Sequence, residues 1–188
     1  MTAPHTPVLE PSAWVRRFAG MIAPAGHVLD YACGSGRHAR WLARVGFDVE
    51  AVDRDPEALA RLAGEARVST RLADLEDGPW PFAEAGFDAI VVTNYLFRPR
   101  FDAMLACLRP GGVLIYETFM LGQERYGRPS NPAFLLRPGE LLQRLAADFT
   151  IVAFEQGVVH SPRDAVIQRV CAVKASEAIV DLPVPGAA

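Results

Sequence analysis

Short apolar runs alternate with segments of helical periodicity along most of the chain. The runs are rich in β-branched residues and predict strands at residues 27–31, 48–53, 68–72, 88–93 and 113–117. Apolar residues at three- and four-residue spacing predict helices at residues 12–22, 37–45, 56–66, 101–108 and 138–147. Strands that alternate with helices form βαβ units, so the pattern predicts an α/β fold with a doubly wound, mostly parallel sheet.

The pattern changes towards the end of the chain. Two strand-like runs, residues 149–158 and 165–173, follow each other without a helix between them. Residues 161–164 read Ser-Pro-Arg-Asp, which is typical of a turn. We therefore expect a C-terminal antiparallel hairpin, which completes a seven-stranded sheet. Pro-Gly-Gly at residues 110–112 predicts a turn before the last parallel strand.

The composition is that of a globular protein. The 188 residues are 51% hydrophobic and 22% charged, with 19 Lys and Arg against 22 Asp and Glu and hence a net charge of −3. This length suits one domain, which we place at residues 1–175 with a tail at 176–188. The acidic balance argues against general binding to a phosphate backbone, although a local basic patch stays open.

Three features bear on location. The first residues show no basic segment followed by an apolar run, so no signal peptide is expected. The apolar runs are too short to span a bilayer, and no membrane association is expected. Cys33, Cys107 and Cys171 are widely spaced, which predicts free thiols in the cytoplasm and neither disulfides nor a metal site.

Candidate chemistry begins at the end of the first predicted strand. Ligands of doubly wound sheets bind beyond the carboxyl ends of the strands, where the strand order reverses. The first strand ends in Asp-Tyr-Ala-Cys-Gly-Ser-Gly at residues 30–36. Gly34 and Gly36 permit positive φ and close approach of the backbone to a ligand. The glycine pair alone is equally consistent with a plain strand-to-helix turn.

Acidic residues at the next two strand ends favour a ligand. Asp53 ends the second strand, where a carboxylate accepts both hydroxyl hydrogens of a ribose. The alternative role for Asp53, capping the next helix, is already met by Asp55. Asp74 and Leu75 follow the third strand, where a carboxylate can accept from an adenine amino group while an apolar side chain packs on the ring. Alone, Asp74 would be interpreted as a surface loop residue.

Together these segments resemble the class I S-adenosylmethionine-dependent methyltransferases. The resemblance covers about residues 12–175 and rests on the glycine loop, the acidic strand ends, Asn94-Tyr95-Leu96 after the fourth strand, and Leu-Arg-Pro-Gly-Gly at residues 108–112. It implies a Rossmann-like fold, S-adenosyl-L-methionine as cofactor and methylation as the transferase reaction. The small size and the Gly-Ser-Gly-Arg-His segment at residues 34–38 are similar to the tellurite-resistance group of small methyltransferases.

The resemblance also implies the cofactor-binding residues. Asp53 would hold the ribose, Asp74 and Leu75 the adenine, and Asn94 the methionine and the methyl group. The first helix would supply an arginine for the carboxylate. The full set is Arg17, Asp30, Tyr31, Ala32, Gly34, Gly36, Asp53, Arg54, Asp74, Leu75 and Asn94. Ala32 departs from the family, which has glycine there; alanine should fit this position if the local φ is negative.

A dinucleotide site is the main alternative. Residues 34–39 also fit Gly-x-Gly-x-x-Ala, and Asp53 lies downstream. Asp30, however, suits a cationic methionine end better than a pyrophosphate. The Arg-Pro-Gly-Gly segment and the terminal hairpin are also foreign to the simple dinucleotide fold, so the methyl donor is favoured.

Residues 119–137 form a long stretch without periodicity, which in a compact domain is often a functional lid. This stretch and the neighbouring strand ends carry the residues expected to recognise the methyl acceptor, namely Tyr95, Arg98, Glu117, Arg125, Tyr126 and Arg128. The arginines predict a small polar or anionic acceptor. The alternative is that they fix the loop by pairing with Glu117, Glu124 and backbone carbonyls.

No catalytic side chain is assigned, because in-line methyl transfer to a thiol, carboxylate or oxyanion needs little or no general base. His38 and His160 are expected to be structural. Two other functions stay open: an RNA or protein methyltransferase that reads its target through Arg98, Arg100, Arg125 and Arg128, and a non-catalytic cofactor-binding module. A small-molecule substrate is favoured over nucleic acid, and a monomer or homodimer is expected.

Overall fold

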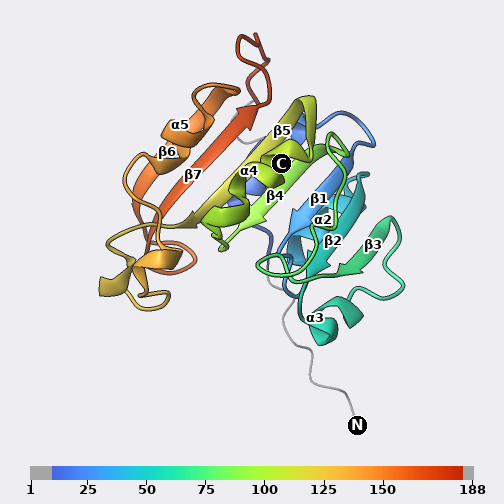
Figure 1. Cartoon of the computed structure of the whole chain (residues 1–188), viewed down its shortest axis with the longest axis horizontal. Helices are drawn as coiled ribbons and strands as arrows, with labels where there is room; N and C mark the ends of the chain where they lie inside the picture. Colours follow the sequence, from blue (N-terminus) through green and yellow to red (C-terminus); the bar gives the residue numbers. More distant parts are fainter. Residues whose placement is uncertain (1–9, 184–188) are drawn as a thin grey trace.

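The computed structural model describes residues 10–183, which are built around one seven-stranded sheet (Figure 1). The strands lie in the order β3-β2-β1-β4-β5-β7-β6. Their bounds are β1 His27–Tyr31, β2 Asp48–Asp53, β3 Val68–Leu72, β4 Phe87–Thr93, β5 Leu108–Phe119, β6 Thr150–Val159 and β7 Ala165–Val173. The expectation about a signal peptide falls largely on residues 1–9, and the tail includes residues 184–188; both ranges lie outside the described residues.

The pairing of the strands confirms the predicted fold class. Strand β1 pairs in parallel with β2 and β4, β2 pairs in parallel with β3, and β4 pairs in parallel with β5. Strand β7 is antiparallel to both β5 and β6, so the C-terminal hairpin is also confirmed. The order reverses between β1 and β4, and this places the expected ligand crevice beyond the carboxyl ends of those strands.

Helices cover both faces of the sheet. Their bounds are α1 Ala13–Phe18, α2 Arg37–Arg44, α3 Pro56–Ala60, α4 Phe101–Ala106 and α5 Glu140–Leu145. The first three bury residues such as Trp14 and Leu42 on one face, and α4 and α5 bury Met104 and Leu141 on the other. Figure 1 shows α4 in front of β4 and β5. Successive side chains of each strand alternate between these two cores, which decides which residues can face the site.

All five helices are shorter than the periodicity predicts, α1 and α3 by the most. Helix α1 ends at Phe18 and continues as a 3₁₀ turn, η1 Ala19–Met21. Helix α3 ends at Ala60 and not near residue 66, because the chain then passes through turns with Gly64 at a φ of +80°. A helix cannot continue through a left-handed residue.

Strand β5 is longer than predicted. The expected turn at residues 110–112 belongs to the strand, which begins at Leu108. The Gly111 N–H donates to the Lys174 carbonyl at 2.8 Å, and the Gly112 carbonyl accepts from the Lys174 N–H at 2.9 Å. The pairing partner lies at the far end of the chain, so local sequence could not reveal it.

The remaining elements are three 3₁₀ turns, η2 Arg98–Arg100, η3 Gln123–Arg125 and η4 Pro132–Phe134. Cys33, Cys107 and Cys171 are buried free thiols. The Ala178 N–H donates to the Thr150 hydroxyl at 2.9 Å, so part of the expected tail is attached to β6. Across residues 10–183, no helix combines the length and the apolar character needed to cross a membrane.

Candidate functional site

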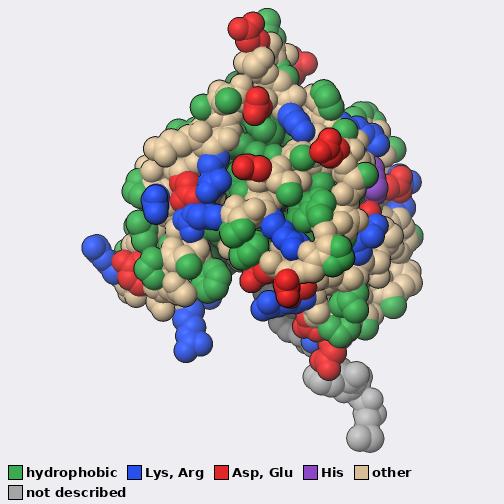
Figure 2. All heavy atoms as spheres, in the orientation of Figure 1, with side chains coloured by type: hydrophobic (Ala, Val, Ile, Leu, Met, Phe, Trp, Pro, Cys, Tyr) green, Lys and Arg blue, Asp and Glu red, His purple; other side chains and the backbone are tan. Residues whose placement is uncertain are grey.

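A pocket of about 230 Å³ lies beyond the carboxyl ends of β1, β2, β3 and β4. Its lining residues come from the loops after these strands: Ala32, Asp53, Arg54, Ala73, Asp74, Leu75, Glu76, Asn94 and Tyr95. All of them except Ala73 and Glu76 belong to the predicted site. Figure 2 shows that the molecule is hollowed at this edge, with charged side chains of both signs around the hollow.

The Asp53 carboxylate is held at the pocket wall by the backbone. Its Oδ2 accepts from the Gly34 N–H at 2.7 Å, and its Oδ1 accepts from the Asp55 N–H at 3.0 Å. These bonds join the end of β2 to the glycine loop after β1. Each carboxylate oxygen retains a lone pair, so Asp53 can still accept from two neighbouring hydroxyl groups of a ligand.

The glycine loop uses left-handed backbone at three positions. Gly34 has a φ of +54° and Gly36 a φ of +74°, and a Cβ on Gly36 would collide with Leu62 after α3. Ala32 has a φ of +55°, so the condition of a negative φ, under which alanine should fit, is not met. The alanine occupies a conformation that favours glycine, because the loop must turn sharply between β1 and α2. A Cβ on Gly34 would meet only open space.

The third side of the pocket is formed by the loop after β3. The Asp74 Oδ1 accepts from the N–H groups of Glu76 and Asp77, at 2.8 and 3.3 Å, which holds this loop in a turn. Leu75 is buried and joins the core while lining the pocket. The charged residues of the lining are three acids, Asp53, Asp74 and Glu76, and one base, Arg54, so the wall is acidic on balance.

Tyr95 lies between the pocket and the core. Its ring packs edge-on against Tyr31 at 5.5 Å, and burial together with the charges of Glu76 and Asp74 raises the pKa of its hydroxyl. The hydroxyl is buried and has no hydrogen-bond partner among residues 10–183. A buried hydroxyl without a partner costs free energy, so the pocket wall offers a polar atom that a ligand can satisfy.

Two predicted cofactor residues lie beneath the pocket. Asp30 and Tyr31 are buried on opposite faces of β1 because strand side chains alternate. The Asp30 carboxylate accepts from the Ala39 N–H at 2.9 Å, and burial raises its pKa to about 7. It supports the first turn of α2, and the pocket lining does not include it. Tyr31 packs against Tyr95 and Trp80.

Arg17 and Glu117 are engaged on the α1 face of the sheet. Arg17 pairs with Glu155 on β6 at 3.3 Å and stacks over Trp14 and Phe18. The Glu117 carboxylate accepts from the Ser12 hydroxyl at 2.8 Å and from Arg169 at 3.0 Å. The structure therefore does not bring either residue into the pocket, since residue 117 of β5 points to the face opposite Tyr116.

Arg98 is committed to the loop and is not free for an acceptor. Its guanidinium donates twice to Glu140 on α5, at 2.8 Å each, and also to the carbonyls of Ala133 and Leu135. The substrate-binding prediction for Arg98 is corrected to the structural alternative, with Glu140 as partner in place of Glu117 or Glu124. Burial acts to raise the pKa of Glu140. The hydrogen bonds from Arg98, the Arg137 N–H and Arg144 outweigh this effect and lower the pKa to about 2.

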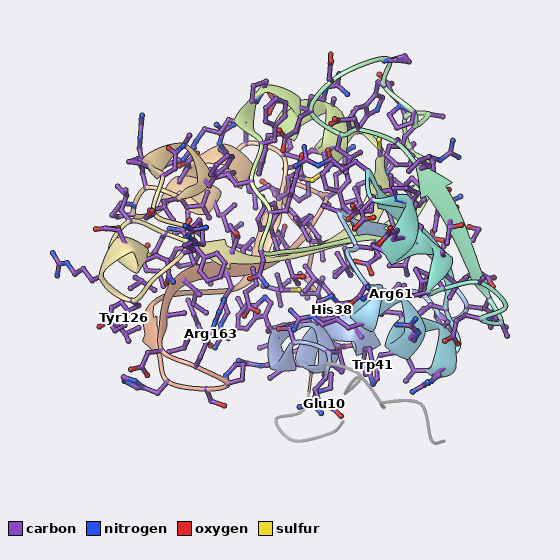
Figure 3. The ribbon with its side chains drawn as sticks, turned by 90° about the horizontal axis from the view of Figure 1, so that it is seen from below. Glu10, His38, Trp41, Arg61, Tyr126 and Arg163 are labelled. Carbon is purple, nitrogen blue, oxygen red and sulfur yellow. The ribbon has the colours of Figure 1, made fainter. Side chains whose placement is uncertain are left out.

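The segment 119–137 forms the other side of the hollow. It carries Arg125, Tyr126 and Arg128, which are exposed, and in the described chain neither guanidinium has a hydrogen-bond or ion-pair partner. Figure 3 views the molecule from below and shows Tyr126 near Arg163 of the β6–β7 turn, away from His38 and Arg61. These three predicted substrate residues lie outside the pocket lining.

Sequence reasoning missed two groups of residues. Ala73 and Glu76 line the pocket because the loop after β3 folds back over Asp74, which a strand pattern does not reveal. Ser12, His38 and Thr93 form a hydrogen-bonded cluster beside the glycine loop. A histidine two residues after Gly36 was the available signal, and its partners come from two other elements.

A doubly wound sheet with a glycine loop after β1 and a carboxylate ending β2 is typical of α/β proteins that bind a cofactor containing a nucleoside. Residues 28–112 match a family described as a methyltransferase domain. This match and the solved structures that are similar to the chain support a class I S-adenosylmethionine-dependent methyltransferase with S-adenosylmethionine as cofactor. The dinucleotide alternative is therefore not supported.

Known proteins share the domain and the fold. A tRNA U34 carboxymethyltransferase of Methylococcus capsulatus is 32% identical over 150 residues, which cover 67% of this chain and 45% of that protein. TehB from Haemophilus influenzae has a TM-score of 0.68 and 23% identity, covering 93% of this chain and 63% of TehB. The chain thus spans about half the length, or less, of the curated relatives that it matches.

A solved structure with ligands is also similar. The 1,6-didemethyltoxoflavin-N1-methyltransferase of Burkholderia thailandensis, with 1,6-didemethyltoxoflavin and S-adenosylhomocysteine bound, has a TM-score of 0.64 and 25% identity. The match covers 87% of this chain and 76% of that protein.

Proposed function

We propose that this protein transfers a methyl group from S-adenosylmethionine to a small polar or anionic molecule. The observation that carries the proposal is the acidic pocket at the topological switch point, where Asp53 is fixed by the Gly34 N–H. Methyl transfer is an in-line displacement in which the cofactor supplies an electrophilic methyl carbon on a sulfonium.

The residues present fit this cofactor. The Asp53 carboxylate would accept from the two ribose hydroxyls, and Leu75 with the Asp74 loop would hold the adenine. The Ala32–Gly34 backbone and Asn94 would border the methionine part. The acidic lining suits a ligand whose sulfonium and ammonium groups outweigh its one carboxylate. The orphaned Tyr95 hydroxyl supports a polar ligand at the same wall.

The chain's own contribution is alignment and exclusion of water. The acceptor would approach from the hollow between this pocket and the segment 119–137. Arg125 and Arg128, which are exposed and unpaired within residues 10–183, would attract an anionic acceptor. Such an acceptor carries its own electron pair, so no general base is required at the reacting atom.

Calorimetric titration with S-adenosylmethionine and S-adenosylhomocysteine tests the cofactor step. We expect the wild-type protein to bind both, and Asp53→Ala to weaken binding at least tenfold because the ribose loses its acceptor. Asp148→Asn removes an exposed carboxylate at the opposite edge of the sheet and serves as the matched control. Absence of binding by the wild-type protein would remove the basis of the proposal.

Labelling of a cell extract with methyl-labelled cofactor tests transfer. We expect label in a small-molecule fraction that adsorbs to an anion exchanger. Label only in protein or RNA would overturn the acceptor class. Binding of cofactor without any labelled product would favour the non-catalytic module.

RNA is the second candidate acceptor, favoured by the exposed Arg125 and Arg128 beside the hollow and by the relative named as a tRNA carboxymethyltransferase. This candidate predicts salt-dependent binding of bulk tRNA that weakens when both arginines are replaced by alanine. No binding at low salt would exclude it.

A further inference from the structure

A hydrogen bond between Ser12 and His38 connects the start of α1 to α2, the helix that follows the glycine loop. The Ser12 N–H donates to the His38 Nε2 at 3.2 Å, although the two residues are 26 positions apart. The Ser12 hydroxyl accepts from the Trp14 N–H at 3.1 Å, which caps α1, and donates to the Glu117 Oε1 at 2.8 Å. The start of α1 is thus fixed by three bonds through one residue.

The hydrogen bonds define the state of the His38 ring. His38 is buried, and burial together with the charge of Arg37 lowers its pKa to about 3, so the ring is neutral near pH 7. Because Nε2 accepts from a backbone N–H, the proton of the neutral ring is on Nδ1. Nδ1 lies 3.3 Å from the Thr93 Oγ1, to which it donates.

His38 and Thr93 lie next to the glycine loop and to a lining residue of the cofactor pocket, although neither residue lines the pocket itself. His38 follows Gly36 by two residues on α2, and Thr93 ends β4 immediately before Asn94, a lining residue. Asn94 is held in turn, because its N–H donates to the Glu117 carbonyl at 2.9 Å. Figure 3 shows His38 beside α1, with Glu10 on the outer side of that helix.

We propose that His38 is a positioning residue for methyl transfer: through Nε2 and Nδ1–H it fixes the start of α1 and the end of β4 against the glycine loop. The inference rests on the proposed function, because the position of Asn94 and the glycine loop matters for methyl transfer only if the cofactor binds there. His38 touches no pocket atom itself and acts through Thr93 and Ser12.

Two substitutions separate positioning from simple stability. His38→Gln keeps an acceptor near the place of Nε2, whereas His38→Leu removes both polar atoms. We expect His38→Leu to weaken S-adenosylhomocysteine binding at least tenfold, and His38→Gln to stay within threefold of the wild-type value. Thr150→Ala is the matched control, since it also removes two hydrogen bonds of a partly buried side chain, at the far edge of the sheet. It should lower the melting temperature without changing the affinity.

Ser12 provides a second pair of variants. Ser12 has a φ of −54°, which proline accepts, so Ser12→Pro removes the N–H and the hydroxyl without a change of backbone conformation. Ser12→Ala removes only the hydroxyl. The difference in affinity between the two variants isolates the bond to Nε2, and we expect Ser12→Pro to be the weaker binder by at least threefold.

Two spectroscopic readouts do not depend on the cofactor. The ¹⁵N shifts of the His38 ring should show a neutral Nδ1–H tautomer at pH 7, and amide exchange at Ser12 should be faster in His38→Leu than in the wild type and in Thr150→Ala. If the wild-type protein fails to bind S-adenosylhomocysteine while these readouts hold, the proposed function is wrong and the anchoring stands. An Nε2–H tautomer, unchanged exchange, or equal affinity of the Gln and Leu variants would overturn the inference.

Discussion

Single residues in the glycine loop carry a conformational cost that the resemblance to the family did not foresee. Ala32 stands at a φ of +55°, where a Cβ crowds the backbone. The strain lies at the wall of the pocket, and strained residues concentrate at ligand sites because surrounding structure holds them there.

Replacing Ala32 by glycine should therefore stabilise the protein. We expect Ala32→Gly to raise the free energy of unfolding by about 0.5–1 kcal/mol, because the relief of strain exceeds the added entropy of the unfolded chain. The same change at Ala103, inside α4, should cost about 1 kcal/mol. Urea unfolding of both variants measures these changes in the free energy of unfolding. If Ala32→Gly destabilises the protein as much as Ala103→Gly does, the φ of residue 32 does not have this role.

The buried Asp30 should make stability depend on pH. Its pKa of about 7 in the folded protein lies above the ordinary value of 3.8, so the folded state holds this proton more tightly than the unfolded chain does. Its contribution to stability is full below about pH 4 and is lost as the pH rises towards 7. We expect Asp30→Asn to be more stable than the wild type by about 1–3 kcal/mol at pH 8 and similar to it near pH 4. If the free energy of unfolding varies with pH in the same way in both proteins, Asp30 does not have this effect on stability.

At the scale of elements, the segment 119–137 is held in place by hydrogen bonds to Arg98 in η2 and to the backbone of β7. Arg98 in η2 donates to Glu140 on α5 and to two carbonyls of the segment. The Gln123 side chain accepts from the Val166 N–H on β7 at 2.8 Å. An irregular segment without periodicity thus has a defined position because polar side chains pair with backbone groups across its boundary.

Loss of the Arg98 guanidinium should loosen this segment. Arg98→Ala leaves the mostly buried Glu140 short of its main partner, and we expect a loss of about 2–3 kcal/mol. Arg144→Ala removes a single bond to the same carboxylate and should cost about 1 kcal/mol or less. Limited proteolysis should then cut within residues 119–137 in the Arg98 variant and not in the Arg144 variant; identical cleavage patterns would count against the assignment.

At the scale of the whole molecule, the site depends on four separate loops that meet at one edge of the sheet. A ligand that bridges them should couple the two halves of the sheet and stabilise the fold as a unit. With S-adenosylhomocysteine at about one hundred times its dissociation constant, the gain is about 2.7 kcal/mol. For a domain of this size we expect a rise in melting temperature of about 5–10 °C, measured by calorimetry. Asp53→Ala, with binding weakened at least tenfold, should show about half of that rise or less at the same ligand concentration.

The sequence by itself determined what depends on neighbouring residues. Strands β1, β2 and β7 lie at the predicted residues, since a buried strand must be a short apolar run bounded by turns. Strand β3 also lies at the predicted residues, although most of its side chains are exposed. Asp53, Asp74 and Asn94 reach one pocket because they end parallel strands of one sheet.

Tertiary structure decided what depends on contacts between distant segments. The pairing of Lys174 with Gly111 lengthened β5. Arg98 forms an ion pair with Glu140, although the sequence had suggested that it binds the methyl acceptor. The turn into α2 set the φ of Ala32. His38 found partners on two other elements, which no local pattern encodes. Periodicity records which face of an element is buried, whereas hydrogen-bond partners depend on which elements meet across the fold.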